Sequence, residues 1–266
     1  MNLYTIPPPL SCHNDDVDDD DDDNVDDNVD DDVDDDDDDN VDDVNIIWLA
    51  SFDIGKKNFA FCIEEVDLNQ LSKIPCEIPP LASRYYSDGT PTPNYQSILD
   101  HVERTGRIIL IENIDLTYGT DPTLYLDPRV MVNMTRLLDS YMEYWQKCEV
   151  FLIEQQMNFG KNKTNTMALK LGQHCYSYFA IHFSSFKVTL EFPAYHKTKV
   201  MGAPRKMAKP QRKLWSIDRA LTLLFTRNDH NTMHRFGESG KRDDMADVIM
   251  QLQAFKILVF LLDHLK

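Results

Sequence analysis

Short runs of consecutive apolar residues, each ending in a polar turn, recur along the chain after residue 44. The first run is almost continuously apolar, which is typical of a central strand that is covered on both faces. Five runs of this kind predict β-strands, at residues 46–52, 59–63, 107–114, 148–153 and 187–192. Only the polar turn 53–58, which contains a glycine, separates the first two strands, so we expect them to form a hairpin.

In the second half of the chain, apolar residues also recur every three or four positions, which predicts amphipathic helices. The helices are expected at residues 128–145, 162–183, 211–225 and 241–262. Their alternation with strands predicts an α/β domain, with a mixed five-stranded sheet flanked by helices. Residues 64–106, with five prolines, are expected to be an insertion off the second strand. Residues 226–240 are expected to be a polar turn, in which His230 and His234 have no third metal ligand nearby.

The first 44 residues have a composition that cannot form a hydrophobic core. Residues 15–43 contain 21 aspartates, interrupted only by Val and Asn, so apolar burial cannot offset the ordering entropy and the charge repulsion. We therefore expect a disordered acidic tail over residues 1–44 and one folded domain over residues 45–266. All 27 basic side chains lie in that domain with 24 acidic ones, so its net charge is +3, whereas that of the whole chain is −18.

The cysteines and the apolar segments indicate where the protein works. Five cysteines without a CxxC pair indicate neither a disulfide framework nor a zinc ribbon, and favour a reducing, intracellular compartment. The first ten residues lack the pattern of a signal peptide. The apolar run at residues 257–262 is too short to span a bilayer, so we expect a soluble protein with no membrane partner.

Acidic residues occur at three places where a carboxylate can face a cleft. Asp53 follows the first strand, Glu154 follows the strand at 148–153, and Asp243, Asp244 and Asp247 open the last helix. Right-handed crossovers bring the ends of parallel strands to one edge of a sheet, and residues three or four apart share a helix face. Carboxylates that meet there repel one another unless cations lie between them, and two divalent ions would neutralise the cluster. Helix geometry alone does not decide between Asp243 and Asp244.

Each of these acids also has a simpler interpretation. Asp53 can be an ordinary turn aspartate, and Glu154 can be the solvated end of a strand. The helix acids can be a cap and a solvated first turn, which the helix dipole favours.

Three segments carry a resemblance to a known family. Residues 52–60 (FDIGKKNFA), 153–156 (IEQQ) and 241–247 (KRDDMAD) resemble, in this order, the three acidic motifs of RuvC-type Holliday-junction resolvases. Within this family, the sequence most resembles the branch found in poxviruses and other large DNA viruses. The resemblance implies a ribonuclease H-like fold. The resemblance runs from about residue 46 to residue 262, and the insertion and the tail have no counterpart in it.

The resemblance also implies a function. It suggests a homodimeric, magnesium-dependent endonuclease that nicks four-way DNA junctions symmetrically during DNA recombination or replication. Its metal ligands would be Asp53, Glu154, Asp244 and Asp247, around two Mg²⁺ ions for which Mn²⁺ can substitute. Such a viral enzyme would act where viral DNA is replicated, in the host cytoplasm. The apolar helices at 129–145 and 164–183 would form the dimer interface.

Residues 187–213 contain eight basic residues and one acidic residue, and they predict a DNA-binding surface. The side chains expected to contact phosphates are Lys197, Lys199, Arg205, Lys206, Lys209, Arg212 and Lys213. Such contacts give salt-sensitive binding that tolerates many sequences. The alternative is a basic loop that is only solvated. Lys161 and Lys163 would extend the surface, and the aspartate tail would either compete with DNA for it or remain a plain solvated extension.

Two other functions are compatible with the same motifs. One is another ribonuclease H-like nuclease, acting on flaps or RNA–DNA hybrids, and the oligomeric state would separate it from a resolvase. The other is a non-catalytic DNA-binding module, which the intact set of four acids disfavours, because carboxylates repel phosphates. A sugar-kinase or actin-like ATPase would need glycine-rich phosphate loops, and the nine glycines of the chain form none.

Overall fold

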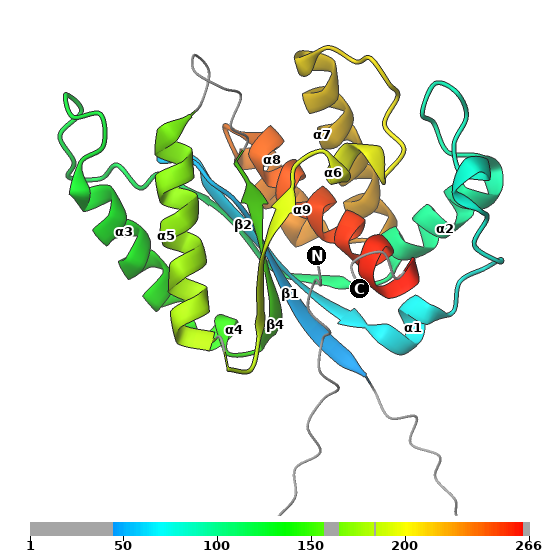
Figure 1. The fold of residues 1–266 in the computed structure, drawn as a ribbon, viewed down its shortest axis with the longest axis horizontal. Helices are drawn as coiled ribbons and strands as arrows, with labels where there is room; N and C mark the ends of the chain where they lie inside the picture. The colour runs from blue at the N-terminus through cyan, green and yellow to red at the C-terminus, as the bar shows by residue number, and fades with distance from the viewer. Residues whose placement is uncertain (1–44, 157–164, 184, 263–266) are drawn as a thin grey trace, which may run out of the picture.

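The computed structural model describes residues 45–156, 165–183 and 185–262. Within these residues, one sheet has the strand order β3-β2-β1-β4-β5 (Figure 1). The strands are β1 (Ile46–Asp53), β2 (Phe59–Asp67), β3 (Arg107–Ile114), β4 (Cys148–Gln155) and β5 (Val188–Pro193). β2 is antiparallel to both β1 and β3, whereas β4 is parallel to both β1 and β5. The predicted mixed five-stranded sheet is confirmed, including the hairpin between the first two strands.

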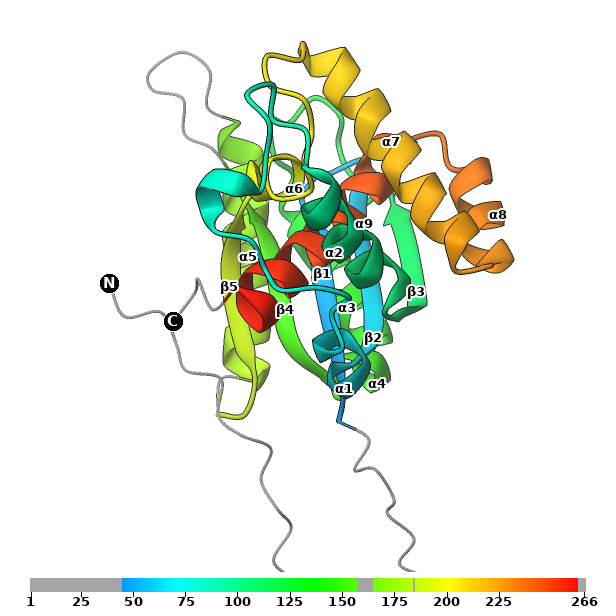
Figure 2. The same cartoon turned by 90° about the vertical axis from the view of Figure 1, so that its right-hand side faces the viewer.

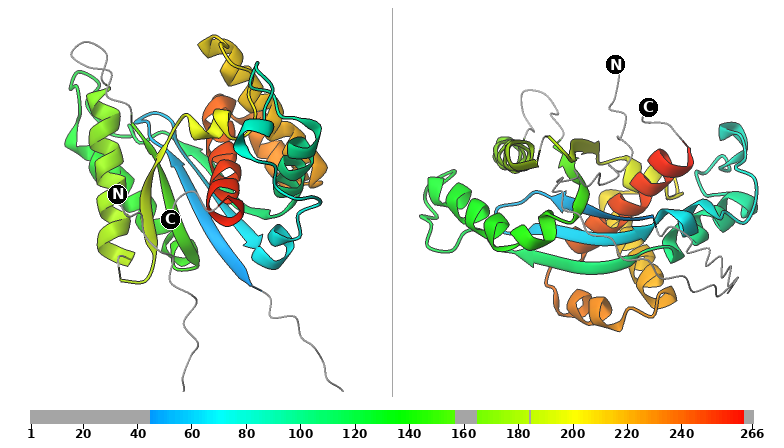
Figure 3. Two further views of the ribbon diagram at one scale, coloured as in Figure 1. Left: turned by 45° about the vertical axis from the view of Figure 1, so that its right-hand side comes forward. Right: turned by 90° about the horizontal axis from the view of Figure 1, so that it is seen from below.

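Helices cover both faces of this sheet (Figures 1 and 3). One face carries α3 (Pro128–Ser140), α4 (Met142–Trp145) and α5 (Thr166–Phe183), and the other carries α2 (Pro93–Arg104), α7 (Lys209–Thr226) and α9 (Arg242–Lys256). The shorter elements are α1 (Leu68–Ser72), η1 (Leu81–Ser83), α6 (His196–Lys199), α8 (His230–Glu238) and the π-helical η2 (Ile257–Leu261). In the part of the chain that the structure describes, no helix is long and apolar enough to cross a membrane.

Alternate residues of β1 enter two hydrophobic cores, as the period of two along a strand requires. Leu49 belongs to the core under α9, whereas Ala50 and Phe52 belong to the core under α3 and α5. The second core is rich in aromatic rings, and Phe151 stacks on Phe179 with ring centroids 4.2 Å apart. The central strand is therefore covered on both faces, as its continuous apolar sequence predicts.

A buried ionic network locks α9 onto β2. Glu64 of β2 is completely buried and accepts hydrogen bonds from Lys256 Nζ at 2.8 Å and from Arg227 Nη2 at 2.7 Å. Burial alone would raise the pKa of Glu64, but these two cations outweigh it and hold the pKa below its usual value. Removal of one partner would leave an uncompensated buried charge, which costs about 3–5 kcal/mol. The C-terminal end of α9 is thus fixed in register against the sheet.

The expected insertion begins later than the prolines predict. β2 continues through Asp67, so the predicted boundary at residue 64 is wrong, and residues 64–67 belong to the sheet. The cause is the buried Glu64, whose charge interrupts the apolar pattern although its partners neutralise it. The excursion itself covers residues 68–106 and contains α1, η1 and α2.

Three other predicted boundaries change in the structure. The prediction of a polar turn at residues 226–240 is wrong, because α8 forms there. Asp229 caps this helix by accepting a hydrogen bond from Thr232 N, and Phe236 of the helix is buried. The helix at 128–145 is interrupted at Tyr141, which separates α3 from α4. α5 begins at Thr166, later than residue 162. The aspartate tail, Lys161 and Lys163 lie outside the described residues, so those predictions are untested.

Candidate functional site

Two of the predicted acids lie side by side because their strands are parallel neighbours. Phe52 of β1 is the register partner of Ile153 of β4, so Asp53 and Glu154 follow at the same edge of the sheet. Buried apolar residues precede both acids in their strands, so the backbone that carries them is held by the core. Neighbouring parallel strands thus bring together two carboxylates that are far apart in the sequence.

The third acid comes from α9, which packs across β1 and β2 and begins at the same edge (Figure 1). The buried side chain of Gln251 donates a hydrogen bond from Nε2 to the carbonyl oxygen of Leu152 in β4, at 3.0 Å. Asp247 lies four residues before Gln251 and therefore on the same face of the helix. The bond sets the position of Asp247 relative to Glu154, which lies two residues beyond Leu152.

Asp53, Glu154 and Asp247 can each offer one carboxylate oxygen such that all three oxygens lie within 4.8 Å of one another. Among the described residues, this is the group of acidic, histidine or cysteine side chains that could hold a metal ion. Burial raises the pKa of the Asp53 carboxyl well above its usual range, and the charge of Glu154 raises it further. Hard divalent cations prefer carboxylate oxygens, so this donor set fits such an ion.

Lys197 lies inside this group of acids. Its Nζ donates to Glu154 Oε2 at 2.9 Å and to Asp247 Oδ2 at 2.7 Å, and its side chain is only 9% exposed. Burial alone would lower the pKa of Lys197, but the charges of Glu154, Asp247 and Asp53 outweigh it, and the pKa is raised. The Lys197 ammonium therefore lies among the carboxylates and not on the exposed basic surface, and its contact with DNA phosphates stays a prediction.

The first turn of α9 separates its two neighbouring aspartates. Asp243 forms an ion pair with Lys213 of α7. Asp244 lies outside the group of three, but burial raises its pKa to about 6, and the charges of Asp243 and Asp247 contribute to the increase. The charge of Asp244 also contributes to the raised pKa of Asp53, which links Asp244 electrostatically to the site.

The remaining residues of the basic stretch differ in their surroundings. Lys199, Arg205, Lys206, Lys209, Arg212 and Lys213 are all exposed. Lys213 pairs with Asp243, while the guanidinium of Arg205 donates to the carbonyl oxygen of Ser87 at 3.3 Å. Their contact with DNA stays a prediction.

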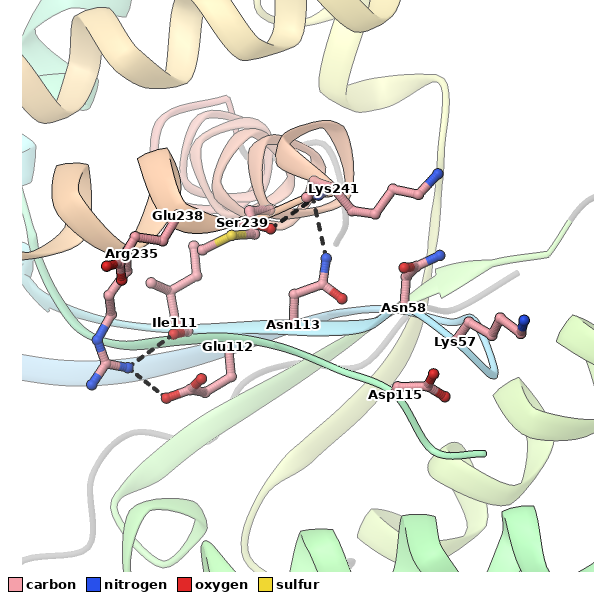
Figure 4. A pocket seen from close by; sticks show the side chains of 12 residues that line it. Lys57, Asn58, Ile111, Glu112, Asn113, Asp115, Arg235, Glu238, Ser239 and Lys241 are labelled. Atoms are coloured by element: carbon pink, nitrogen blue, oxygen red, sulfur yellow. Dashed lines mark hydrogen bonds and ion pairs between the residues drawn. The ribbon is translucent and has the colours of Figure 1, made fainter. Parts of the chain in front are cut away.

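A hollow of about 600 Å³ is lined by residues of the β1–β2 turn, of β3 and of the segment from α8 to the start of α9 (Figure 4). It is lined by three basic residues, Lys57, Arg235 and Lys241, and by three acidic residues, Glu112, Asp115 and Glu238. Arg235 pairs with Glu112 at 2.5 Å, and Asn113 donates to the carbonyl oxygen of Lys241 at 3.3 Å. Because its charges balance, the hollow by itself indicates no particular ligand.

The strand order and the acids at the C-terminal ends of β1 and β4 define the class of protein. This is an α/β domain with a mixed five-stranded sheet, an acidic site at one edge of that sheet and an excursion between β2 and β3. No protein-family model matches the chain.

Two viral proteins are relatives in sequence. Uncharacterized protein 170L of Invertebrate iridescent virus 6 is 31% identical over 245 residues, which cover 80% of this chain and 89% of that protein. Uncharacterized protein 97L of Invertebrate iridescent virus 3 is 28% identical over 212 residues, covering 78% of this chain and 98% of that protein. The chain belongs to the family of the iridescent virus protein 170L.

Solved structures of three resolvases are similar in fold. The Fowlpox virus resolvase in complex with Holliday junction DNA has a TM-score of 0.44 and 15% identity, covering 80% of this chain and 99% of its own. Thermus thermophilus RuvC has a TM-score of 0.44 and 10% identity, covering 80% and 97%. The yeast mitochondrial Holliday junction resolvase Ydc2 has a TM-score of 0.47 and 15% identity, covering 81% and 80%.

Proposed function

We propose that this protein is a metal-dependent endonuclease that resolves four-way DNA junctions by paired, symmetric nicks. The observation that carries the proposal is the meeting of Asp53, Glu154 and Asp247, from two strands and a helix, around one point. Carboxylates crowded in this way repel one another, which supports a site that takes up divalent cations. The family relationship to viral proteins supports a role in processing viral recombination or replication intermediates at the site of viral DNA replication in the host cytoplasm.

The chain offers four carboxylates for Mg²⁺, with Asp53, Glu154 and Asp247 in the group and Asp244 beside it. When bound, two divalent ions would activate a water molecule and stabilise the departing 3′ oxygen. Burial and the charge of Glu154 raise the pKa of Asp53, and an added cation would oppose both effects by favouring the ionised carboxylate, which supports this assignment. Mn²⁺ has similar ligand preferences and would substitute.

Lys197 would have a second task in the reaction. Its ammonium is held by two carboxylates and is almost out of contact with solvent. A cation in such a dry environment interacts more strongly with a phosphodiester than a solvated lysine does. We propose that Lys197 donates a hydrogen bond to a non-bridging phosphate oxygen and stabilises the negative charge that develops there.

Paired nicks need two copies of the site related by a two-fold axis, so the proposal includes a homodimer. Helices α3 and α5 cover one face of the sheet, and Val132 and Ile181 on them are 45% and 78% exposed. These apolar side chains support the outer face of α3 and α5 as the interface between protomers. Light scattering of the protein with junction DNA would test this, and a monomeric mass would favour a simpler nuclease.

The direct test is a nicking assay on a synthetic four-way junction labelled on each strand in turn. We expect symmetric nicks with Mg²⁺, none with chelator, and none with Asp247→Asn, which keeps the size of the side chain. A flap and an RNA–DNA hybrid of matched sequence are the competing substrates. Preferential cutting of either one would replace junction resolution by another ribonuclease H-like activity. Junction binding without any cutting would indicate a non-catalytic module.

A further inference from the structure

The helix that carries Lys197 is too short to be stable alone. α6 contains only residues His196–Lys199, whereas isolated helices shorter than about 12–15 residues are marginal in water. Its position therefore depends on what it contacts. α9 packs against α6, and Lys197 pairs with Asp247 of that helix. The C-terminal end of α6 still needs partners for its carbonyl groups.

The excursion between β2 and β3 supplies such a partner. Residues 84–92 form a closed turn, which we call the brace turn, and Figure 2 shows the excursion beside α6. Two backbone hydrogen bonds close it, from Tyr86 N to Thr90 O at 2.8 Å and from Thr92 N to Arg84 O at 2.9 Å. The carboxylate of Asp88 accepts a further bond from Thr90 N at 2.9 Å. These bonds make the brace turn a compact unit, with a fixed shape to press against its neighbours.

Three contacts join the brace turn to the segment directly after α6. The hydroxyl of Tyr85 donates to the carbonyl oxygen of Val200, at the end of α6, at 2.8 Å. The backbone N–H of Arg205 donates to the carbonyl oxygen of Asp88 at 2.6 Å. Gly202, with φ +77°, lies so close to Pro91 that an added Cβ would come within 2.6 Å of Pro91 Cδ. The segment after α6 is thus held at its start, middle and end.

The other side of the brace turn is anchored in the core. The ring of Tyr85 packs edge-on against the ring of Tyr95, with centroids 5.1 Å apart, and Tyr95 is completely buried in α2. A continuous chain of contacts therefore runs from the core through Tyr85 to Val200 and α6. Lys197 lies three residues before Val200 on that helix.

We propose that the brace turn positions Lys197 in the carboxylate site and that Tyr85 is the positioning residue. Tyr85 itself does not touch the carboxylates or the substrate; it acts by holding the end of α6. The consequence for catalysis rests on the proposed nuclease function. The consequence for the position of the Lys197 ammonium does not, and it can be measured without DNA or metal.

The first test is Tyr85→Phe, which keeps the ring on Tyr95 and removes only the hydroxyl. The matched control is Tyr86→Phe, because Tyr86 lies in the same turn with a side chain that is 53% exposed. With junction DNA saturating, we expect the nicking rate of Tyr85→Phe to fall about fivefold while junction affinity stays unchanged. Tyr86→Phe should match the unmodified protein in both. A loss of affinity without a loss of rate would overturn the positioning role.

The second test measures the ammonium directly. The full-length protein is treated with an amine-reactive ester, and mass spectrometry compares labelling of buried Lys197 with that of exposed Lys199. We expect strong protection of Lys197 in the unmodified protein and several-fold more labelling in Tyr85→Phe. A lower melting temperature with unchanged protection of Lys197 would mean a general structural role and would overturn the proposal. If no variant nicks DNA, the proposed function fails, but the labelling ratio still decides whether the brace turn holds Lys197.

A second pair of variants approaches the same contact from the other side. Gly202→Ala pushes a methyl group into Pro91, whereas Gly119→Ala has the same left-handed strain (φ +67°) with no atom within 4 Å of its Cβ. We expect Gly202→Ala, and not Gly119→Ala, to increase Lys197 labelling. Equal labelling in both variants would mean that the contact between Gly202 and the brace turn does not control α6.

Discussion

Gln251 of α9 donates its side-chain N–H to the carbonyl oxygen of Leu152 in β4, at 3.0 Å, and both residues are completely or almost completely buried. Gln251 lies one helical turn after Asp247, and Leu152 lies two residues before Glu154. The bond therefore sets the spacing between two carboxylates that no direct bond joins.

The bond between Gln251 and Leu152 leads to a prediction about metal affinity. Gln251→Met keeps the volume of the side chain but leaves the carbonyl oxygen without this donor. We expect about 1 kcal/mol less stability and about tenfold weaker Mn²⁺ binding, measured by calorimetry. Gln173→Met on the exposed side of α5 is the control and should change neither. Unchanged Mn²⁺ affinity in Gln251→Met would show that the bond does not set the site.

The carboxylates should stabilise the metal-bound protein and destabilise the metal-free one. Asp53→Asn, Glu154→Gln and Asp247→Asn should each reduce nicking about 1,000-fold or more while junction binding persists. Because burial and Glu154 raise the folded-state pKa of Asp53, its contribution to stability is full below about pH 4 and is lost as pH rises through the folded-state pKa. In chelator, Asp53→Asn should therefore exceed the unmodified protein in stability by an amount that grows with pH. Denaturant unfolding at several pH values measures this, and a difference that shrinks with pH would contradict it.

Lys197 should compete with metal for the same negative charge. Lys197→Met leaves the carboxylates without their internal cation, so we expect lower stability in chelator and a larger rise in melting temperature when Mg²⁺ is added. Nicking should fall about 100-fold. Lys199→Met on the same short helix is exposed and is the control. An equal Mg²⁺ effect on the melting temperature of both variants would contradict the competition.

The two neighbouring aspartates of α9 should behave differently. Asp243 is paired with Lys213, whereas Asp244 is electrostatically coupled to Asp53. We expect Asp244→Asn to abolish nicking and Asp243→Asn to retain most of it. Asp243→Asn should instead reduce stability slightly, because it removes the ion pair with Lys213. The opposite pattern of activity would make Asp243 the metal ligand.

The sequence predicted well those parts of the site that depend on regular elements. Asp53 and Glu154 follow continuous apolar strands, so their place at the edge of the sheet follows from the strand pattern. Asp247 follows from helical spacing. These predictions rest on local periodicity, which the hydrophobic cores preserve in the folded protein.

The sequence did not predict the parts that depend on contacts between distant segments. Lys197 lies in a basic stretch that is typical of a solvated surface, but in the structure it pairs with Glu154 and Asp247, which are distant in the sequence. Glu64 interrupts an apolar strand, and its partner Lys256 is 192 residues away. α8 has few apolar positions, so its buried Phe236 is a weak signal in the sequence. In each case the deciding partner is set by tertiary packing, which a single sequence does not reveal.

The ionic network at the end of α9 constrains the length of this helix. Asp247 is needed near its start and Lys256 near its end, and each has partners fixed by the sheet. One residue inserted between them would turn the two ends relative to each other by about 100°. Either the acids or the buried ion pair would then point away from their partners. Between these positions, evolution can exchange side chains but cannot add or remove a residue, so related proteins with an intact site should keep the same separation between the acid and the lysine.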